Sequence, residues 1–277
     1  MHTPQTLLLL CSLSHLWRGI HAPVGRRSGV MRCAALALLL ACACRVSAAP
    51  VSSPASPFWS CASLDRGVAL SYDDGPGPYT EALLDALRDG GAPAAFFVLS
   101  RAAAARPDTV RRALAEGHTV GLHTATHANL SALWEAGDMA GIRREVDDAA
   151  DELEAVTGQR PRYFRPPYGA LVPGLRDYLH ERGFAIAMWS SGCVDWALRD
   201  SAKELPLLIY GLADAGALVC LHDIWPSTVE GAPALLRALR SGPEGGWANP
   251  QGRQVISLDR CTGHGKHAAD AAASFVE

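Results

Sequence analysis

The chain has 277 residues, of which 49% are hydrophobic and 19% are charged, and its formal net charge is −3. This length is sufficient for one sizeable domain, or two small ones, with a full hydrophobic core. The near balance of charges provides no strongly basic surface. We therefore expect neither a nucleic acid nor a membrane as a stable partner.

Residues 1–48 have the pattern of a targeting segment. After Met31 a basic residue precedes an apolar run, and small residues follow at 46–48, which predicts a secretory signal cleaved after Ala48. Met31 is then a candidate start, and residues 1–30 are either an over-extended gene start or a longer targeting segment. The alternative is a membrane anchor over residues 31–45, although this run is short for a bilayer span. We expect a secreted protein that acts outside the cell, at the cell wall.

The rest of the chain divides into three parts. Residues 49–60, rich in Ala, Ser and Pro, are predicted to be a linker, residues 61–263 a catalytic domain, and residues 264–277 a flexible tail. Four of the eight cysteines fall in the targeting segment, which leaves Cys61, Cys193, Cys220 and Cys261. Three pairings are open in an oxidising compartment. We favour Cys61–Cys261 because these two flank the domain, while Cys193 and Cys220 are either paired or buried thiols.

Along the domain, short apolar runs typical of strands alternate with amphipathic stretches. The runs are residues 67–72, 92–100, 118–123, 162–167, 184–190, 217–223 and 254–259. Helices are predicted over residues 80–90, 107–117, 142–158, 173–183 and 232–242, with Thr80 as the N-cap of the first and Gly158 ending the third. Asn129, in a glycosylation sequon, is favoured as another helix N-cap.

Apolar strands separated by single helices imply a parallel sheet covered by helices. About seven such units fit a closed or nearly closed β/α barrel, with a doubly wound open sheet as the alternative. Polar residues follow or close these strands at their C-terminal ends: Asp73, Asp74, His123, Arg165, Asp195 and His222. In a barrel those ends converge on one face, so this shared register predicts an enzyme.

The stretch HTATH places His123 and His127 four residues apart. If the chain turns helically here, both imidazoles lie on one face and reach a single cation. Together with an aspartate they form a ligand set with open positions, which suits Zn²⁺ but also admits Co²⁺ or another divalent metal. One aspartate of the adjacent pair can then bind the metal, while the other accepts a proton from water.

These motifs resemble, in the same order, those of the polysaccharide deacetylases with a NodB-homology domain, carbohydrate esterase family 4, and within them the chitin deacetylases. SYDDGP at 71–76 matches the first motif, HTATH at 123–127 the second and RPPYG at 165–169 the third. The resemblance spans about residues 61–263 and implies the distorted (β/α)7-type barrel of this family. It also implies that Asp73 is the general base, and that Asp74, His123 and His127 bind the metal.

The third motif implies three further site residues. Arg165 is expected to hold and tune the base, and the backbone N–H of Tyr168 is expected to donate a hydrogen bond to the oxyanion. Pro166 and Tyr168 are expected to contact the substrate.

The fourth and fifth motifs, WSSGCVDW and CLH, depart from the family pattern. Gly192 replaces an aspartate of the fourth motif, and Cys220 replaces the usual leucine of the fifth. By resemblance, His222 is the general acid that protonates the leaving amine. Asp195 is its partner, and Trp196 and Leu221 form an apolar wall for the acetyl methyl group.

The expected reaction is hydrolysis of N-acetyl groups on N-acetylglucosamine units of chitin or chitooligosaccharides, with release of acetate. The partner is thus an N-acetylglucosamine polymer or oligomer, and we expect a monomer. The alternatives are an O-acetyl esterase acting on xylan, a peptidoglycan N-acetylglucosamine deacetylase, and a carbohydrate-binding homologue without catalysis. We favour chitin because Cys61 and Cys261 resemble the cysteines that frame secreted fungal-type chitin deacetylases.

Overall fold

The structure is a computed structural model, and it describes residues 56–61, 67–192, 194–203, 216–241 and 253–263. The chain divides into two compact units, Met1–Ala48 and Ala49–Glu277, and all of the described residues belong to the second. The predicted signal segment, the predicted tail and Cys193 lie outside the described residues.

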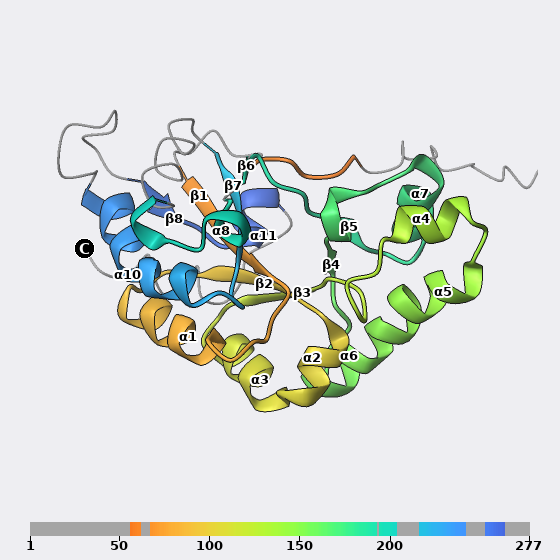
Figure 1. Cartoon of the computed structure of the whole chain (residues 1–277), viewed down its shortest axis with the longest axis horizontal. Coiled ribbons are helices and arrows are strands. Elements are labelled where there is room, and N and C mark those ends of the chain that lie inside the picture. Colours follow the sequence, from red (N-terminus) through yellow and green to blue (C-terminus); the bar gives the residue numbers. More distant parts are fainter. Residues whose placement is uncertain (1–55, 62–66, 193, 204–215, 242–252, 264–277) are drawn as a thin grey trace, which may run out of the picture. The chain divides into compact units, whose positions relative to one another are not determined.

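A single curled sheet of parallel strands forms the centre of the domain (Figure 1). Its strands are β1 (Gly67–Asp73), β2 (Ala94–Val98), β3 (Thr119–Leu122), β4 (Tyr163–Phe164), β5 (Ala185–Ile186), β6 (Ser191–Gly192), β7 (Leu218–His222) and β8 (Gln254–Val255). They are ordered β5-β4-β3-β2-β1-β7-β6, and β8 pairs with the start of β1. The predicted distorted barrel is confirmed, and the sheet is not the open doubly wound alternative.

Helices connect the strands and cover the outer side of the sheet, where α1, α3, α2 and α6 form a row (Figure 1). They are α1 (Thr80–Asp89), α2 (Ser100–Ala105), α3 (Pro107–Ala115), α4 (Leu130–Glu135), α5 (Met139–Arg143), a π-helical turn η1 (Arg144–Asp148), α6 (Ala149–Thr157), a 3-10 turn η2 (Pro167–Gly169), α7 (Pro173–Glu181), α8 (Asp195–Leu198), α10 (Pro226–Ser241) and α11 (Leu258–Thr262). None of these helices is long and apolar enough to cross a membrane.

Helix ends follow the local signals in most cases. Proline occupies the first turn of α3 and α7, where its missing N–H costs nothing. Gly158 ends α6 in the left-handed conformation, at φ 76°. The favoured cap at Asn129 is confirmed, since its side chain accepts a hydrogen bond from the Ala132 N–H at 3.1 Å.

The prediction for Thr80 is wrong. Tyr79 is the N-cap of α1, and Thr80 is the first helical residue. The Thr80 hydroxyl instead accepts a hydrogen bond from the Gly77 N–H and donates one to Asp223, which directly follows β7. A partner 143 positions away in the chain therefore overrides the local capping pattern.

Several predicted boundaries also need correction. The runs 162–167 and 184–190 contain only the two-residue strands β4 and β5. The run 92–100 forms a strand only over β2, because Ser100 already begins α2. The run 254–259 likewise contains only the two residues of β8, since the Ser257 side chain caps α11. Helix α10 begins at Pro226, six residues before its predicted start.

The sheet separates two apolar clusters. The larger one packs the outer side chains of the strands, such as Leu70, Phe96 and Val219, against the helices. The smaller one fills the inside of the curl and includes Phe97 and Tyr163. Side-chain alternation along each strand produces this division.

Strands β5 and β6 are the two edges of the sheet, and residues 187–190 run directly from one to the other. Phe58, within the stretch predicted as a linker, pairs with Ala187 as an isolated bridge. Its N–H donates to the Ile186 carbonyl, and its carbonyl accepts from the Met188 N–H. Residues 187–190 thus cross the gap between the two edge strands, and Phe58 pairs with the backbone at the start of this segment.

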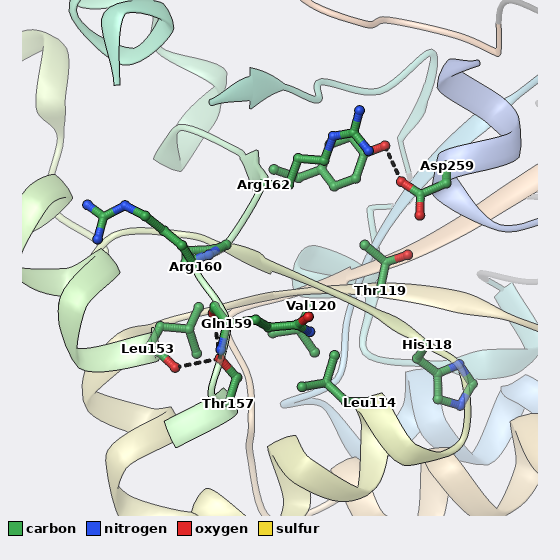
Figure 2. Close-up of a pocket in the computed structure, with 12 residues that line it drawn as sticks. Leu114, His118, Thr119, Val120, Leu153, Thr157, Gln159, Arg160, Arg162 and Asp259 are labelled. Carbon is green, nitrogen blue, oxygen red and sulfur yellow. Dashed lines mark hydrogen bonds between the residues drawn. The ribbon is translucent and has the colours of Figure 1, made fainter. Parts of the chain in front are cut away.

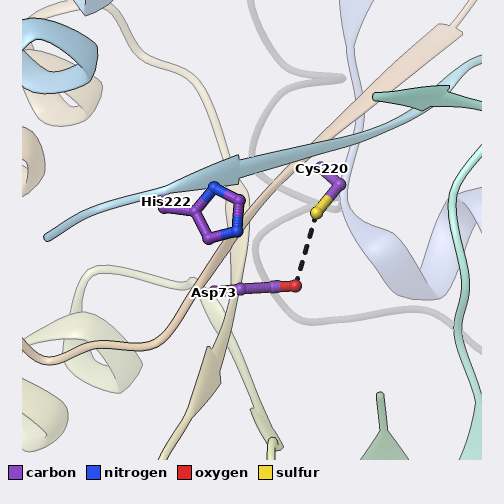
Figure 3. Close-up of side chains that lie close together, drawn as sticks. All are labelled: Asp73, Cys220 and His222. Atoms are coloured by element: carbon purple, nitrogen blue, oxygen red, sulfur yellow. Dashed lines mark hydrogen bonds between the residues drawn. The ribbon is translucent and has the colours of Figure 1, made fainter. Parts of the chain in front are cut away.

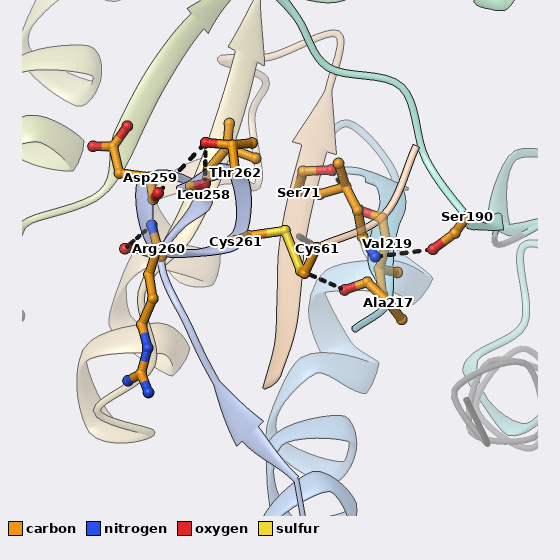
Figure 4. The surroundings of a disulfide bond; sticks show 12 residues. Cys61, Ser71, Ser190, Ala217, Val219, Leu258, Asp259, Arg260, Cys261 and Thr262 are labelled. Carbon is orange, nitrogen blue, oxygen red and sulfur yellow. Dashed lines mark hydrogen bonds between the residues drawn. A yellow bond between two sulfur atoms is a disulfide. The ribbon is translucent and has the colours of Figure 1, made fainter. Parts of the chain in front are cut away.

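A disulfide joins Cys61 to Cys261, which confirms the favoured pairing (Figure 4). Cys61 precedes β1 and Cys261 lies in α11, so the bond connects the two ends of the described domain. Cys220, on β7, is a free buried thiol.

Candidate active site

The predicted site residues gather at the C-terminal ends of β1, β3, β4 and β7. Asp73 is the last residue of β1 and is paired in register with His222, the last residue of β7. His123 and Arg165 directly follow β3 and β4. Parallel strands bring these ends to one edge of the sheet, as the sequence register predicted.

Three side chains converge as a candidate metal centre. Asp74 Oδ1 lies 3.5 Å from His123 Nε2 and 3.3 Å from His127 Nε2. The same oxygen is buried and has no hydrogen-bond partner among the described residues. A divalent cation fits this donor set, because two imidazoles and a carboxylate suit zinc and an unpaired buried oxygen is costly without a cation.

The surroundings of His123 favour a ligand role. The Nδ1 atom of its ring lies 2.6 Å from the Arg165 carbonyl, so Nδ1 carries the proton and Nε2 presents a lone pair. Burial lowers the pKa of His123 despite the opposing charges of Asp73 and Asp74. The ring is therefore neutral at physiological pH, as metal binding requires.

The condition of a helical turn over HTATH is not met. Thr124 and His127 both have positive φ, 73° and 66°, and the segment forms an irregular loop. The Thr124 hydroxyl accepts a hydrogen bond from the His127 N–H at 2.9 Å, which closes this loop. The two histidine rings still approach each other, with centroids 5.1 Å apart, so the ligand pair forms by a different backbone route.

Glu145, in the π-helical turn, holds this loop by hydrogen bonds. The sequence analysis did not identify this residue. Its carboxylate accepts hydrogen bonds from the backbone N–H groups of Ala125 and Thr126, at 3.1 and 2.9 Å. It also accepts one from the Thr126 hydroxyl at 2.7 Å. An acidic residue in a long amphipathic stretch ordinarily faces solvent, so the sequence offered no signal for this contact.

Asp73 is held by Arg165, as the sequence predicted. A guanidinium nitrogen of Arg165 lies 2.7 Å from Asp73 Oδ1, and both side chains are buried. Burial raises the pKa of Asp73, but the positive charge of Arg165, with that of His222, outweighs it and holds that pKa below its usual value. Asp73 is therefore ionised at neutral pH and can accept a proton.

Each of the three guanidinium nitrogens of Arg165 donates at least one hydrogen bond. Besides Asp73, the guanidinium donates to the Ser71 hydroxyl at 2.8 Å and to the carbonyls of Ala187 and Met188 at 2.9 and 2.8 Å. It also stacks over the Phe97 ring at 4.0 Å. These four hydrogen bonds and the carboxylate of Asp73 make the burial of this cation tolerable.

His222 is paired with Asp195, again as predicted. Its Nδ1 lies 2.8 Å from Asp195 Oδ1, and its backbone N–H donates to Asp195 Oδ2 at 2.8 Å. The Thr228 hydroxyl, from α10, donates to the same oxygen at 2.8 Å and was not identified from the sequence. Burial lowers the pKa of His222, but the hydrogen bond and charge of Asp195 raise it overall, to about 9.

The predicted substrate-contact residues differ in exposure. Tyr168 and Trp196 are 67% and 57% exposed, so both side chains are available to a ligand. The Tyr168 ring stands edge-on to His127, with ring centroids 4.6 Å apart. Pro166 is buried between Arg165 and η2.

Leu221 is not brought to the site. It is buried in the outer cluster together with Val219, two residues earlier on β7. Alternation along the strand directs it away from His222, so its predicted contact with the acetyl methyl group finds no support in this geometry.

Position 75, in the DDGP turn, requires a glycine because the Asp223 side chain lies too close for a Cβ atom. A Cβ atom there would lie 2.1 Å from a carboxylate oxygen of Asp223. Asp223 is fully buried, and burial raises its pKa to about 7. As a carboxylate directly after a strand, Asp223 showed the same sequence signal as Asp74 and was overlooked.

A cavity at the opposite ends of the strands does not belong to this site (Figure 2). It is lined by His118, which precedes β3, and by Tyr163, which begins β4 and donates to Asp259. The His118 ring accepts from the Ala94 N–H at 3.1 Å, and burial lowers its pKa to about 4. His118 is thus a neutral histidine that supports the fold.

Comparison with known proteins places these residues in context. A family model described as polysaccharide deacetylase matches residues 62–187, which include both aspartates, both histidines and Arg165. A peptidoglycan-N-acetylglucosamine deacetylase from Bacillus cereus is 33% identical over 186 residues, covering 64% of this chain and 67% of that protein. A chitooligosaccharide deacetylase from Bradyrhizobium sp. is 36% identical over 163 residues, or 58% and 72% of the two chains.

Among solved structures, a peptidoglycan N-acetylglucosamine deacetylase in complex with a naphthalenyl benzamide matches with a TM-score of 0.67 at 25% identity. The match covers 76% of this chain and 94% of that one. The likeness therefore extends over nearly the whole of the solved chain.

Proposed function

This chain belongs to the polysaccharide deacetylase family, carbohydrate esterase family 4, and from that premise we propose that it removes N-acetyl groups from N-acetylglucosamine units of chitin or chitooligosaccharides. One observation carries the proposal. The Asp73 carboxylate and the His222 imidazole face each other from register-paired strand ends, beside the Asp74, His123 and His127 ligand set. This combination supplies a base and an acid at one metal centre.

A divalent cation held by Asp74, His123 and His127 would polarise the acetyl carbonyl and make a water molecule more acidic. Asp73 accepts the proton of the attacking water at Oδ2, since Oδ1 is held by Arg165. The backbone N–H of Tyr168, in the left-handed conformation at φ 61°, is the proposed donor to the oxyanion. His222 then donates the proton of its Nε2 to the departing nitrogen, because Asp195 holds its Nδ1. The products are acetate and a glucosamine unit.

The experiment is acetate release from chitooligosaccharides, acetylated xylan and muropeptides, measured by mass spectrometry with and without added Zn²⁺. The proposal expects zinc-dependent acetate loss from chitooligosaccharides that a strong chelator abolishes. Acetate release from xylan alone would show that the protein is an O-acetyl esterase and would overturn the proposed N-deacetylase activity. Absence of release from every substrate, with zinc bound, would leave a carbohydrate-binding homologue.

A second candidate substrate is peptidoglycan. The observation that favours it is the 33% identity to a peptidoglycan-N-acetylglucosamine deacetylase over 186 residues, or 67% of that protein. Faster acetate loss from muropeptides than from chitooligosaccharides would decide for this substrate.

Secretion to the cell wall is part of the proposal and has its own test. The pattern of residues 31–48 supports a cleaved signal. N-terminal sequencing of protein recovered from the culture medium should start at Ala49. Intact chain retained with the membrane fraction would indicate an anchor instead.

A further inference from the structure

Three side chains beside the proposed metal centre form a second cluster that the mechanism does not use as a unit: Asp73, Cys220 and His222 (Figure 3). One ligand atom from each lies within 4.8 Å of the other two. The Cys220 thiol donates a hydrogen bond to Asp73 Oδ2 at 3.3 Å. A thiol, an imidazole and a carboxylate make up a donor set typical of zinc.

The sheet register builds this cluster. Cys220 and His222 are two residues apart on β7, so their side chains lie on the same face. Asp73 is the register partner of His222 on the adjacent strand β1. Since all three residues lie in strands, backbone pairing fixes their approach and no loop has to move.

We propose that Asp73, Cys220 and His222 form a second divalent-metal site, which fills at excess Zn²⁺ and blocks the enzyme by engaging its proposed base and acid together. The site differs from the Asp74, His123 and His127 centre in all of its ligands. It is specific to chains with a cysteine at position 220, because the leucine usual in the family motif carries no ligand atom.

The geometry requires only a small closure. Zinc bonds of about 2.0–2.3 Å place tetrahedral ligand atoms about 3.4–3.6 Å apart. The Cys220 sulfur and the Asp73 oxygen are already at 3.3 Å, and the remaining separations are under 4.8 Å. Asp195 engages His222 Nδ1, so the other ring nitrogen, Nε2, is the one free to bind. A hydrogen bond from Nδ1 to a carboxylate, here that of Asp195, commonly orients a zinc-bound histidine.

Metal binding here displaces two protons. The Cys220 thiol and the His222 ring each release a proton to solvent and donate the resulting lone pair, and Asp73 Oδ2 contributes a third pair without a proton change. No electron is transferred. Because both protons compete with the metal and Arg165 places a positive charge beside Asp73, we expect this site to bind more weakly than the first centre.

The test uses Co²⁺, because a cobalt–thiolate bond gives a charge-transfer band in the near ultraviolet. The full chain, freed of metal, is titrated with Co²⁺ alongside Cys220→Leu and Cys193→Ser. The proposal expects the band to grow with the second equivalent in the wild type and in Cys193→Ser. It should be lost in Cys220→Leu, which keeps the first equivalent. An unchanged band in Cys220→Leu would overturn the proposal.

Zinc content after dialysis against excess Zn²⁺ provides the second measurement. The wild type should hold about two zinc ions and Cys220→Leu about one, which also shows that this variant is folded. Cys220→Ser should behave as Cys220→Leu, since a hydroxyl is a poor zinc ligand. One zinc ion in both the wild type and the variants would exclude the site.

Inhibition links the site to catalysis and rests on the proposed function. Acetate release by the wild type should fall at least about tenfold between stoichiometric and excess Zn²⁺. Acetate release by Cys220→Leu should be the same at both zinc concentrations. The two proposals fail separately. A chain that binds cobalt through Cys220 yet releases no acetate would refute only the deacetylase, and zinc-insensitive acetate release without the band would refute only the second site.

Discussion

At the scale of the residue, Asp73 and Asp74 carry the same side chain but differ in backbone and surroundings. Asp73 ends an extended strand and its side chain is 4% exposed, against Arg165. Asp74 adopts a left-handed conformation, φ 74°, and its side chain is 19% exposed, toward the two histidines. The reversal of the backbone between them sends the two carboxylates in different directions. Neighbouring charges therefore serve two purposes at one strand end.

We predict that Asp73→Asn keeps the metal and loses the reaction. The amide cannot accept a proton, so acetate release should fall at least about 100-fold, while zinc content stays at one ion under stoichiometric loading. The matched variant Asp74→Ala should lose the zinc itself. Zinc loss in Asp73→Asn, or acetate release within a few-fold of the wild type, would contradict the division of roles.

The second prediction concerns pH. His222 must be protonated to act as an acid, and its pKa is about 9, so activity should persist through neutral pH and fall as the pH rises through about 9. Asp195→Asn removes the charge that raises this pKa. The alkaline limb should therefore move to lower pH by about one unit or more. The pH–rate profile of Asp200→Asn, a partly exposed aspartate nearby, serves as the control and should be unchanged.

At the scale of the element, α5, η1 and α6 form one run from Met139 to Thr157, interrupted by a π-helical turn. Glu145 lies in that turn and binds the loop that carries His127. Helical periodicity predicted the run, but it could not reveal the π turn or the contact. π-Helical turns of this kind are frequent at functional sites.

We predict that Glu145→Ala weakens metal binding. Loss of three hydrogen bonds frees the loop, and outer-shell substitutions commonly cost ten- to a hundred-fold in metal affinity, so we expect about tenfold. Competition with a chromogenic zinc chelator measures it. Glu154→Ala, in the same run but paired with exposed Arg160, is the control and should bind zinc normally. Equal affinities for the two variants would show that the loop holds its shape without Glu145.

The sequence predicted what depends on local pattern and strand register. The apolar runs, the terminal glycine of α6 and the strand ends that hold Asp73, His123 and His222 all follow from it. It failed where a distant partner decides, as for the Thr80 hydroxyl on Asp223. It left the backbone of the HTATH loop undecided, because spacing alone does not distinguish a helical turn from one built with positive φ.

At the scale of the whole domain, Arg165 couples the closure of the sheet to the chemistry. Two of its donors hold the carbonyls of Ala187 and Met188, in the segment that runs between edge strands β5 and β6. Another nitrogen holds Asp73 and Ser71, on the central strand β1. The same guanidinium thus fixes the gap in the barrel and orients the proposed base.

We predict that Arg165→Lys damages both stability and activity. A lysine keeps the charge but cannot reach these four acceptors with a planar fork, so polar groups are left unpaired in the interior. The free energy of unfolding in urea should drop by about 3 kcal/mol, with acetate release reduced in folded protein. Arg160→Lys, at an exposed ion pair, is the control. An activity loss with unchanged stability would remove the structural half of this role.

The Cys61–Cys261 disulfide has a consequence for the connectivity of the domain. Its two Cα atoms lie 4.3 Å apart although they are separated by 200 positions, so the chain between them is covalently a ring. A ring has no fixed starting point. New termini opened at the exposed turn of Gly158, with the old ends joined near the cysteines, would leave every strand pairing of the sheet in place. The domain is therefore a candidate for circular permutation.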